Sequence, residues 1–519
     1  MRRLFNAAFG ILREPQTRDV LRWSLPALLV GLILRIVLTV HLPYGYFHID
    51  TPDFLTTPDS LIHEHKWEVH GKKTFLLPIL YSLPFAIPGV PVLASIPFAQ
   101  HVLGLATIFL VGALCRLWFR TWKIVILPLT ILTAINPFLL WNEHTLIAET
   151  TFVFCCLLVP IAGTLYARQQ TIGRFVFLTT ALFLAAGARP EGKLLFAFGI
   201  LLLLMLHWKH LRTEWGRLAI MLAVAVATHF LTRTTQAGLL LYTSVARLTP
   251  TELKTAAGFE PYIQPIRASL QQRWEQRPQF PRVADRKAIA AAVKQYLKDD
   301  PSRGEVRRQQ DVNDFCLKLA RETCLRNLSA LPGLAWIKFQ LTANESPAGR
   351  LDASTLFREQ QDAFVDNLER TARLSQKLAG RQLQSEADVQ QFIAASYREV
   401  SWFNQWSDHW LAAVNALRFA DVAYPNPDFP GTRITHYGLP FYFLAAFLGL
   451  VAIMLRRDKL QPFHIAWGLT LIGFFFVIML TGNVRARFRF VFEPFWFIYV
   501  ALLLECVCLG VKALLPRRP

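Results

Sequence analysis

Acidic and basic side chains crowd the stretch 46–84, directly after the first long apolar segment of the chain. Asp50 and Asp53 stand near its start, and Lys72 and Lys73 stand towards its end. A carboxylate held beside a membrane can serve as a general base that takes a proton from a bound hydroxyl. A solvated loop carboxylate is the alternative interpretation for either aspartate. We predict that this loop carries the catalytic base of a membrane enzyme, because a spacer loop has no need of so many charged side chains.

Charged side chains also border later apolar runs. Glu149 enters one run, and Arg189 and Glu191 occupy a tight turn between two others. Arg487 and Arg489 precede the last run. A charge at the centre of a bilayer costs about 2.5–3.5 kcal/mol on insertion scales, so such residues tend to be paired or functional. A structural ion pair is the alternative for Glu149, a helix cap for Arg189, and ordinary flanking charge for the last two arginines.

The loop also contains several histidines, but their spacing matches no established metal-ligand motif: His48, His63, His65 and His70. We therefore predict no metal site among them and expect solvated or hydrogen-bonded imidazoles instead. The remaining residue types require no cofactor, and they leave a divalent cation open.

The composition indicates a membrane domain joined to a sizeable polar domain. Of the 519 residues 53% are hydrophobic, yet 18% are charged, which is more than membrane spans alone would carry. The net charge of +19 raises nucleic acid as a partner. The basic residues instead cluster at the ends of apolar runs, where they set topology and meet anionic headgroups. The predicted partner is therefore the lipid bilayer and not nucleic acid.

Ten apolar runs are candidate membrane spans, at residues 24–42, 95–117, 123–141, 146–167, 173–188, 193–207, 217–234, 438–455, 463–480 and 490–511. Basic residues follow the second, fourth, sixth and eighth runs and also follow the last. Because positive charge favours the cytoplasmic side, this pattern predicts ten spans with both termini in the cytoplasm.

We predict an all-α polytopic membrane protein in three parts. The N-terminal module, 1–235, holds seven spans and the first external loop, 43–92. The polar segment 236–436 is predicted to be an external, mainly helical domain, and 437–519 holds the last three spans. The short apolar piece Thr74–Ile87 is predicted to be a helix lying on the outer membrane surface, since a span there would invert every later loop.

Five short motifs follow one another on the predicted outer face: Asp50-Thr-Pro-Asp53-Phe, Lys73-Thr-Phe-Leu76, Ala148-Glu149-Thr150, Arg189-Pro-Glu-Gly192, and Arg487-Phe-Arg489 followed by Pro494. In this order they resemble the GT-C class of integral-membrane glycosyltransferases, which includes protein O-mannosyltransferases and bacterial aminoarabinose transferases. The resemblance covers about residues 1–235 and 437–519. It does not extend to the polar segment between them.

The resemblance implies transfer of a sugar from a polyprenyl-phosphate-linked donor to an acceptor hydroxyl of a glycan, lipid or protein, with inversion. A phosphate leaving group needs no acid, so one carboxylate that deprotonates the acceptor is enough, unlike the pair used in glycoside hydrolysis. The resemblance implies Asp50 as this base, with Asp53 as its substitute or helper.

It also implies that cationic side chains neutralise the phosphate as charge builds on it. The candidates for this role are Lys72, Lys73, Arg189, Arg487 and Arg489. Glu149 and Glu191 would hold these cations or contact the sugar.

The expected location is a bacterial inner membrane, with the active site facing the periplasm. A secondary transporter or lipid-linked-saccharide translocase with a charged outer cavity is the first alternative. A membrane-anchored scaffold whose external domain binds a partner is the second. The charges gather at one face and no internal repeat is evident, which favours the enzyme.

Overall fold

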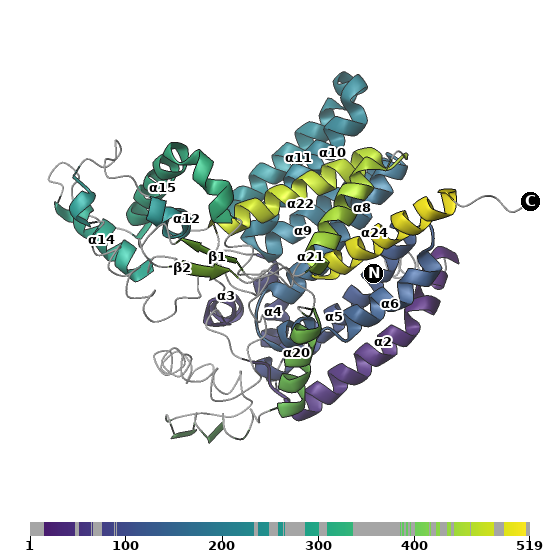
Figure 1. Cartoon of the computed structure of the whole chain (residues 1–519). Helices are drawn as coiled ribbons and strands as arrows, with labels where there is room; N and C mark the ends of the chain where they lie inside the picture. The colour runs from purple at the N-terminus through teal and green to yellow at the C-terminus, as the bar shows by residue number, and fades with distance from the viewer. Residues whose placement is uncertain are drawn as a thin grey trace, which may run out of the picture.

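The computed structural model describes residues 15–46, 51–63, 65, 75–87, 89, 91–232, 237–248, 258–262, 264, 286–299, 309–335, 385, 387–388, 391–392, 395, 400–414, 416, 422–425, 433–436, 441–456, 458–481 and 493–514. These residues form mainly α-helices, together with one two-stranded sheet. In Figure 1 the long apolar helices lie side by side. Helices α12 Ala237–Val245, α14 Arg286–Asp299 and α15 Gln309–Arg326 of the polar segment gather at one side of them, whereas α20 Ser401–Val414 lies apart from these three.

Helices lie at all ten apolar runs: α2 Pro15–His41, α5 Val92–Trp118, α6 Trp122–Ala134, α7 Pro137–His144, α8 Glu149–Arg168, α9 Ile172–Ala188, α10 Phe196–His207, α11 Leu211–Leu231, α21 Phe441–Leu455, α22 Gln461–Thr481 and α24 Glu493–Leu514. The third run is divided between α6 and α7. Two 3-10 turns, η1 Pro190–Leu195 and η2 Trp208–His210, lead into α10 and α11.

In the described part of the chain, six helices are long and apolar enough to cross a membrane. The pair α6 and α7, which meet at an angle of 47°, makes a seventh if they form one broken span. Helices α9 and α21 are apolar but shorter. The class of helical membrane protein is thereby confirmed, whereas the predicted number of ten spans stays a prediction.

Helix α7 begins at a proline, shortly after α6 ends. Pro137 has no backbone N–H to extend the hydrogen-bond ladder of α6, but it suits the first turn of a new helix. The Asn136 side chain caps that helix by accepting from the N–H groups of Phe138 (2.9 Å) and Leu139 (3.2 Å). All eight residues of α7 are buried. The break therefore turns a short helix with a polar C-terminal end into the protein interior.

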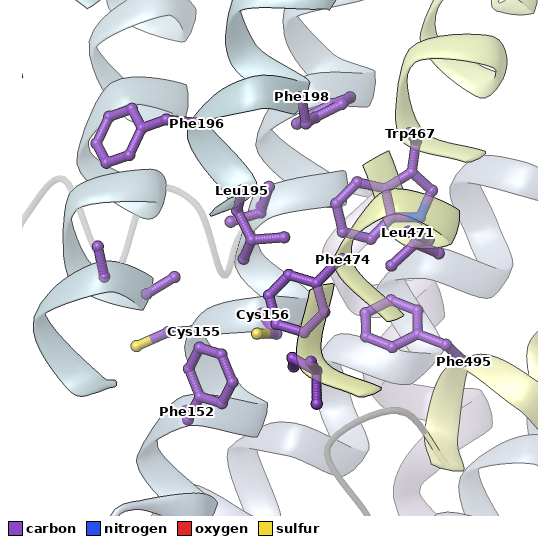
Figure 2. Close-up of a cluster of buried hydrophobic side chains, with 14 of the residues drawn as sticks. Phe152, Cys155, Cys156, Leu195, Phe196, Phe198, Trp467, Leu471, Phe474 and Phe495 are labelled. Atoms are coloured by element: carbon purple, nitrogen blue, oxygen red, sulfur yellow. The ribbon is translucent and has the colours of Figure 1, made fainter. Parts of the chain in front are cut away.

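The last three helices pack against the N-terminal module. Helix α22 contacts α8 and α10, and α24 contacts α6 as well as α21. Figure 2 shows this seam, where Phe198 of α10 lies beside Trp467 of α22, and Phe495 of α24 lies below that ring. Phe152 of α8 lies at the lower end of the same cluster. The Phe198 and Trp467 rings meet edge to face with centroids 5.1 Å apart. The two predicted membrane modules therefore share one apolar core.

Basic residues that were predicted to face the cytoplasm gather at one end of the bundle. Arg168 Nη2 donates to the carbonyl of Leu117 (2.5 Å), and Arg456 Nη1 donates to that of Trp118 (3.5 Å). The C-terminal ends of α5, α8 and α21 therefore meet, as the charge pattern predicts. Which side of a membrane this end faces stays a prediction.

Two short helices follow α2: α3 Thr51–His63 and α4 Leu76–Ala86, which pack against each other. Helix α4 coincides with the predicted surface helix and buries Leu77, Tyr81 and Phe85 on one side. Its position on a membrane surface stays a prediction. Helix α3 lies where the sequence suggested only a charged loop.

The polar segment contains helices α12 Ala237–Val245, α14 Arg286–Asp299, α15 Gln309–Arg326 and α20 Ser401–Val414, and turns η3 Ala246–Leu248 and η4 Leu328–Ala330. On α15, Val312, Phe315 and Leu319 are buried, as their helical spacing predicts. Strand β1 Val422–Pro425 pairs antiparallel with β2 Arg433–His436. The all-α expectation did not include this sheet, because a strand of four residues is too short for its alternation to stand out.

Candidate functional site

Three predicted site residues meet where α8 begins and α9 ends. Arg189 Nη1 donates to Glu149 Oε1 (2.5 Å), and Arg189 Nε and Nη2 donate to the two carboxylate oxygens of Glu191 (both 3.2 Å). We call these three residues the Glu–Arg–Glu triad. The structure thus brings together two sequence motifs that lie on different helices.

A tight turn builds the triad. Arg189 ends α9 with extended backbone (φ −146°, ψ 143°), and Pro190 begins η1. The Gly192 N–H donates to the carbonyl of Arg189 (3.0 Å). A Cβ on Gly192 would lie only 2.3 Å from the carbonyl oxygen of Ala185. Only glycine therefore lets η1 pack this closely on the end of α9, which explains the Arg-Pro-Glu-Gly sequence.

The triad is buried on one side and open on the other. The Glu149 side chain is 3% exposed, that of Arg189 11% and that of Glu191 29%. Burial disfavours the charged guanidinium, but the charges of Glu191 and Glu149 outweigh this effect and raise the pKa of Arg189. Arg189 is therefore a permanent cation bridging two carboxylates. With both carboxylates ionised, the triad carries one negative charge in excess, so a phosphate at this end of the bundle needs further cations.

Six other predicted site residues have no described side chain. Asp53 lies in the first turn of α3, where the backbone alone is described. The others lie outside the described residues altogether: Asp50, Lys72, Lys73, Arg487 and Arg489. Their roles stay predictions.

Helix α4 lies beside the triad. The ring of Phe75, at the start of α4, packs on Gly187, where a Cβ would lie 2.3 Å from that ring. Gly187 stands two residues before the arginine of the triad. On the other side, Tyr81 OH donates to the carbonyl of Ile147 (3.2 Å), two residues before the glutamate that opens α8. The loop that carries the predicted base therefore leads into a helix fastened on both sides of the triad.

A second charged cluster, not predicted from the sequence, is buried among α2, α5 and α7. Arg35 Nη2 donates to Glu143 Oε1 (2.5 Å), and its Nη1 donates to the carbonyl of Gly31 (2.9 Å). His101 Nδ1 lies 3.0 Å from Glu143 Oε2, and His101 Nε2 lies 3.2 Å from His144 Nδ1. We call Arg35, His101, Glu143 and His144 the Arg–Glu–His cluster.

A glycine makes room for this cluster. A Cβ on Gly104 would lie 2.1 Å from the Glu143 carboxylate, so no other residue there would leave space for the ion pair. The sequence shows the charged residues of this cluster but not that they meet. Arg35 and His101 interrupt two apolar runs and Glu143 follows a third, but nothing local says which faces of these helices meet.

One member of the cluster, His144, is hydrogen-bonded to the segment 42–46, which follows α2. His144 Nε2 lies 3.2 Å from the carbonyl oxygen of Tyr44. The Tyr46 N–H donates to the carbonyl of His144 (2.8 Å), and the Leu146 N–H donates to the carbonyl of Tyr46 (3.0 Å). The start of the loop that carries the predicted base is therefore fastened to the junction of α7 and α8.

Comparison of the chain with protein-family models found no match, and comparison with curated proteins found none either. Among the residues that the structure describes, no group of three or more His, Cys, Asp or Glu side chains could hold a metal ion. The site is thus described by its own geometry: a Glu–Arg–Glu triad and an Arg–Glu–His cluster on the two sides of the α7–α8 junction, in a helical membrane protein.

Proposed function

We propose that this protein is a membrane glycosyltransferase of the GT-C type. It transfers a sugar from a polyprenyl-phosphate donor to an acceptor hydroxyl at the outer face of a bacterial inner membrane. The observation that supports this proposal most is the Glu–Arg–Glu triad. Two of the five GT-C-like motifs meet there in space, although 40 positions of the chain separate Glu149 from Arg189.

The packing of α4 is the second support. The loop with Asp50 and Asp53 precedes α4, and α4 contacts both α3 and the end of α9. This arrangement suits a site in which a base from the loop and a cation from the triad act on one substrate. A pair of unrelated surface charges would not need a shared helix between them.

In the proposed reaction Asp50 takes the proton of the acceptor hydroxyl, and Asp53 is the alternative base. The acceptor oxygen forms a bond to the anomeric carbon on the side opposite the phosphate. The bond between that carbon and the phosphate oxygen breaks, and its electron pair leaves with the polyprenyl phosphate. The configuration of the sugar is inverted.

Charge balance divides the cations into two groups. Arg189 is already matched by two carboxylates, so it serves as a rigid hydrogen-bond donor to a sugar or phosphate oxygen. The charge that builds on the leaving phosphate is then neutralised by the remaining candidates, which are Lys72, Lys73, Arg487 and Arg489. Arginine suits bidentate contact with phosphate, and lysine supplies a compact charge.

Transfer is tested with purified protein in lipid vesicles, radiolabelled polyprenyl-phosphate sugars and a panel of acceptors. The proposal expects label in the acceptor fraction and release of unlabelled polyprenyl phosphate. A protein with both Asp50→Asn and Asp53→Asn is the control without a base and should transfer nothing. If no donor is consumed while labelled substrate crosses the vesicle membrane, the transporter or translocase replaces the enzyme.

A further inference from the structure

We propose that His101, Glu143 and His144 form a chain of hydrogen bonds that holds the segment 42–46 in place and so positions the start of the loop carrying Asp50 and Asp53. They are positioning residues, since their contacts are with one another, with Arg35 and with the backbone of residues 42–46. Their consequence for catalysis rests on the proposed function, whereas the docking of the loop does not.

Three links make up the chain. Glu143 Oε2 lies 3.0 Å from His101 Nδ1, and His101 Nε2 lies 3.2 Å from His144 Nδ1. His144 Nε2 lies 3.2 Å from the carbonyl oxygen of Tyr44. Each link joins two heavy atoms at hydrogen-bond distance, and each needs one proton between them.

The acceptor fixes the direction of the last link. A carbonyl oxygen only accepts, so His144 Nε2 donates to the carbonyl of Tyr44. His144 therefore needs an N–H at this ring position to hold the segment 42–46.

Other charged residues lie on the helices that pack around this chain. Arg35 from α2 donates to the other oxygen of Glu143. Helix α8, which contacts α7, contributes Glu149, which the triad holds, and α20, another neighbour of α7, carries Asp408 and His409. Helix α6 carries Lys123 in its first turn, beside Trp122, and α4 has no charged residue.

Opening of the segment 42–46 breaks the link to Tyr44. Removal of the ring N–H that makes this link should therefore make the opening easier.

Hydrogen exchange in lipid nanodiscs measures this opening at the amides of Gly45 and Tyr46, which donate to Leu93 and His144. His144→Phe keeps the ring volume but removes both ring nitrogens, and it should lower the protection factor about tenfold. His144→Gln places an amide N–H where Nε2 stood and should keep most of the protection. Equal protection in the wild type and His144→Phe would overturn the positioning role.

A control variant separates this link from a general loss of stability. Thr107→Val lies on the same helix as His101 and outside the chain of hydrogen bonds, so its protection factor should stay close to that of the wild type. An equal loss of protection in Thr107→Val and His144→Phe would also overturn the positioning role.

These outcomes are separable from the proposed function, because exchange needs no sugar donor. Failure of the exchange results removes the positioning chain and leaves sugar transfer untouched. Absence of transfer by the wild type removes the glycosyltransferase and leaves the docking of residues 42–46 as measured. If both hold, the transfer rates of the His144 variants should follow the order of their protection factors.

Discussion

At the scale of single residues, burial decides what the triad does. Glu149 is the least exposed of its three members and shares one guanidinium with Glu191. A buried ion pair gains little net stability over apolar packing, but removing one partner leaves the other uncompensated. The triad is therefore better understood as a device that holds a charged donor in place than as a source of stability.

Glu149→Gln should lower the free energy of unfolding by about 2 kcal/mol, because Arg189 loses a buried charge-assisted hydrogen bond. Glu191→Gln is the matched control at the same guanidinium. The Glu191 side chain is more exposed, so this variant should lose less than about 1 kcal/mol of the free energy of unfolding. Unfolding in mixed micelles measures both, and equal losses would contradict the role of burial.

Gly192→Ala should destabilise the protein by about 1–3 kcal/mol, since the added methyl group would overlap the carbonyl of Ala185. Gly216→Ala makes the same change on α11, where a Cβ would meet nothing within 4 Å. That control should stabilise the helix by about 0.5–1 kcal/mol. A Gly192→Ala variant of unchanged stability would show that the turn does have space for a methyl group.

At the scale of elements, the sequence predicted the helices well because apolar runs are local. Helix α4 and the runs of the bundle follow from composition and length alone. The pairing of Arg35 with Glu143 does not, because it depends on which faces of α2 and α7 meet. Pro137 sets that contact by ending α6 and turning α7 inward, and no local pattern fixes the angle between two helices.

The Glu–Arg–Glu triad could be predicted from the sequence only in part. Glu149, Arg189 and Glu191 were each candidates on charge and place, and the Arg-Pro-Glu-Gly turn predicted two of them as neighbours. Their common hydrogen-bond network depends on how α8 packs against α9. The four-residue strands β1 and β2 carried too little alternation to be predicted.

Helix α15 offers a test of burial in the polar segment. Burial raises the pKa of the Cys316 thiol to about 12, and alkylation requires the thiolate. At about pH 8 iodoacetamide should leave Cys316 unmodified in the folded protein, whereas the partly exposed Cys324 should react. Mass spectrometry after unfolding should find both modified. Faster alkylation of Cys316 than of Cys324 in the folded protein would contradict the packing of α15.

At the scale of the whole molecule, one end of the bundle is basic and the opposite end holds the triad. The positive-inside rule predicts that the basic end faces the cytoplasm. Helix α8 runs between these two ends, from Glu149 of the triad to Arg168 at the basic end.

Cysteine labelling in intact cells tests this orientation. Two single cysteines are introduced, Ser385→Cys and Gly173→Cys. Ser385 is exposed in the polar segment, and Gly173 is exposed at the basic end. A membrane-impermeant maleimide should label the first in intact cells and the second only after permeabilisation, each compared with the parent chain. The reverse pattern would place the triad in the cytoplasm.

The most direct measurement of the central claim compares sugar transfer by the wild type, Asp50→Asn and Asp53→Asn, with donor binding measured in parallel. We expect Asp50→Asn to bind the polyprenyl-phosphate sugar normally and to lose transfer by at least about 100-fold, since a general base contributes about that much. Asp53→Asn should retain measurable transfer. Full activity of Asp50→Asn alongside an inactive Asp53→Asn would move the base to Asp53. Full activity of both variants would contradict a carboxylate base in this loop.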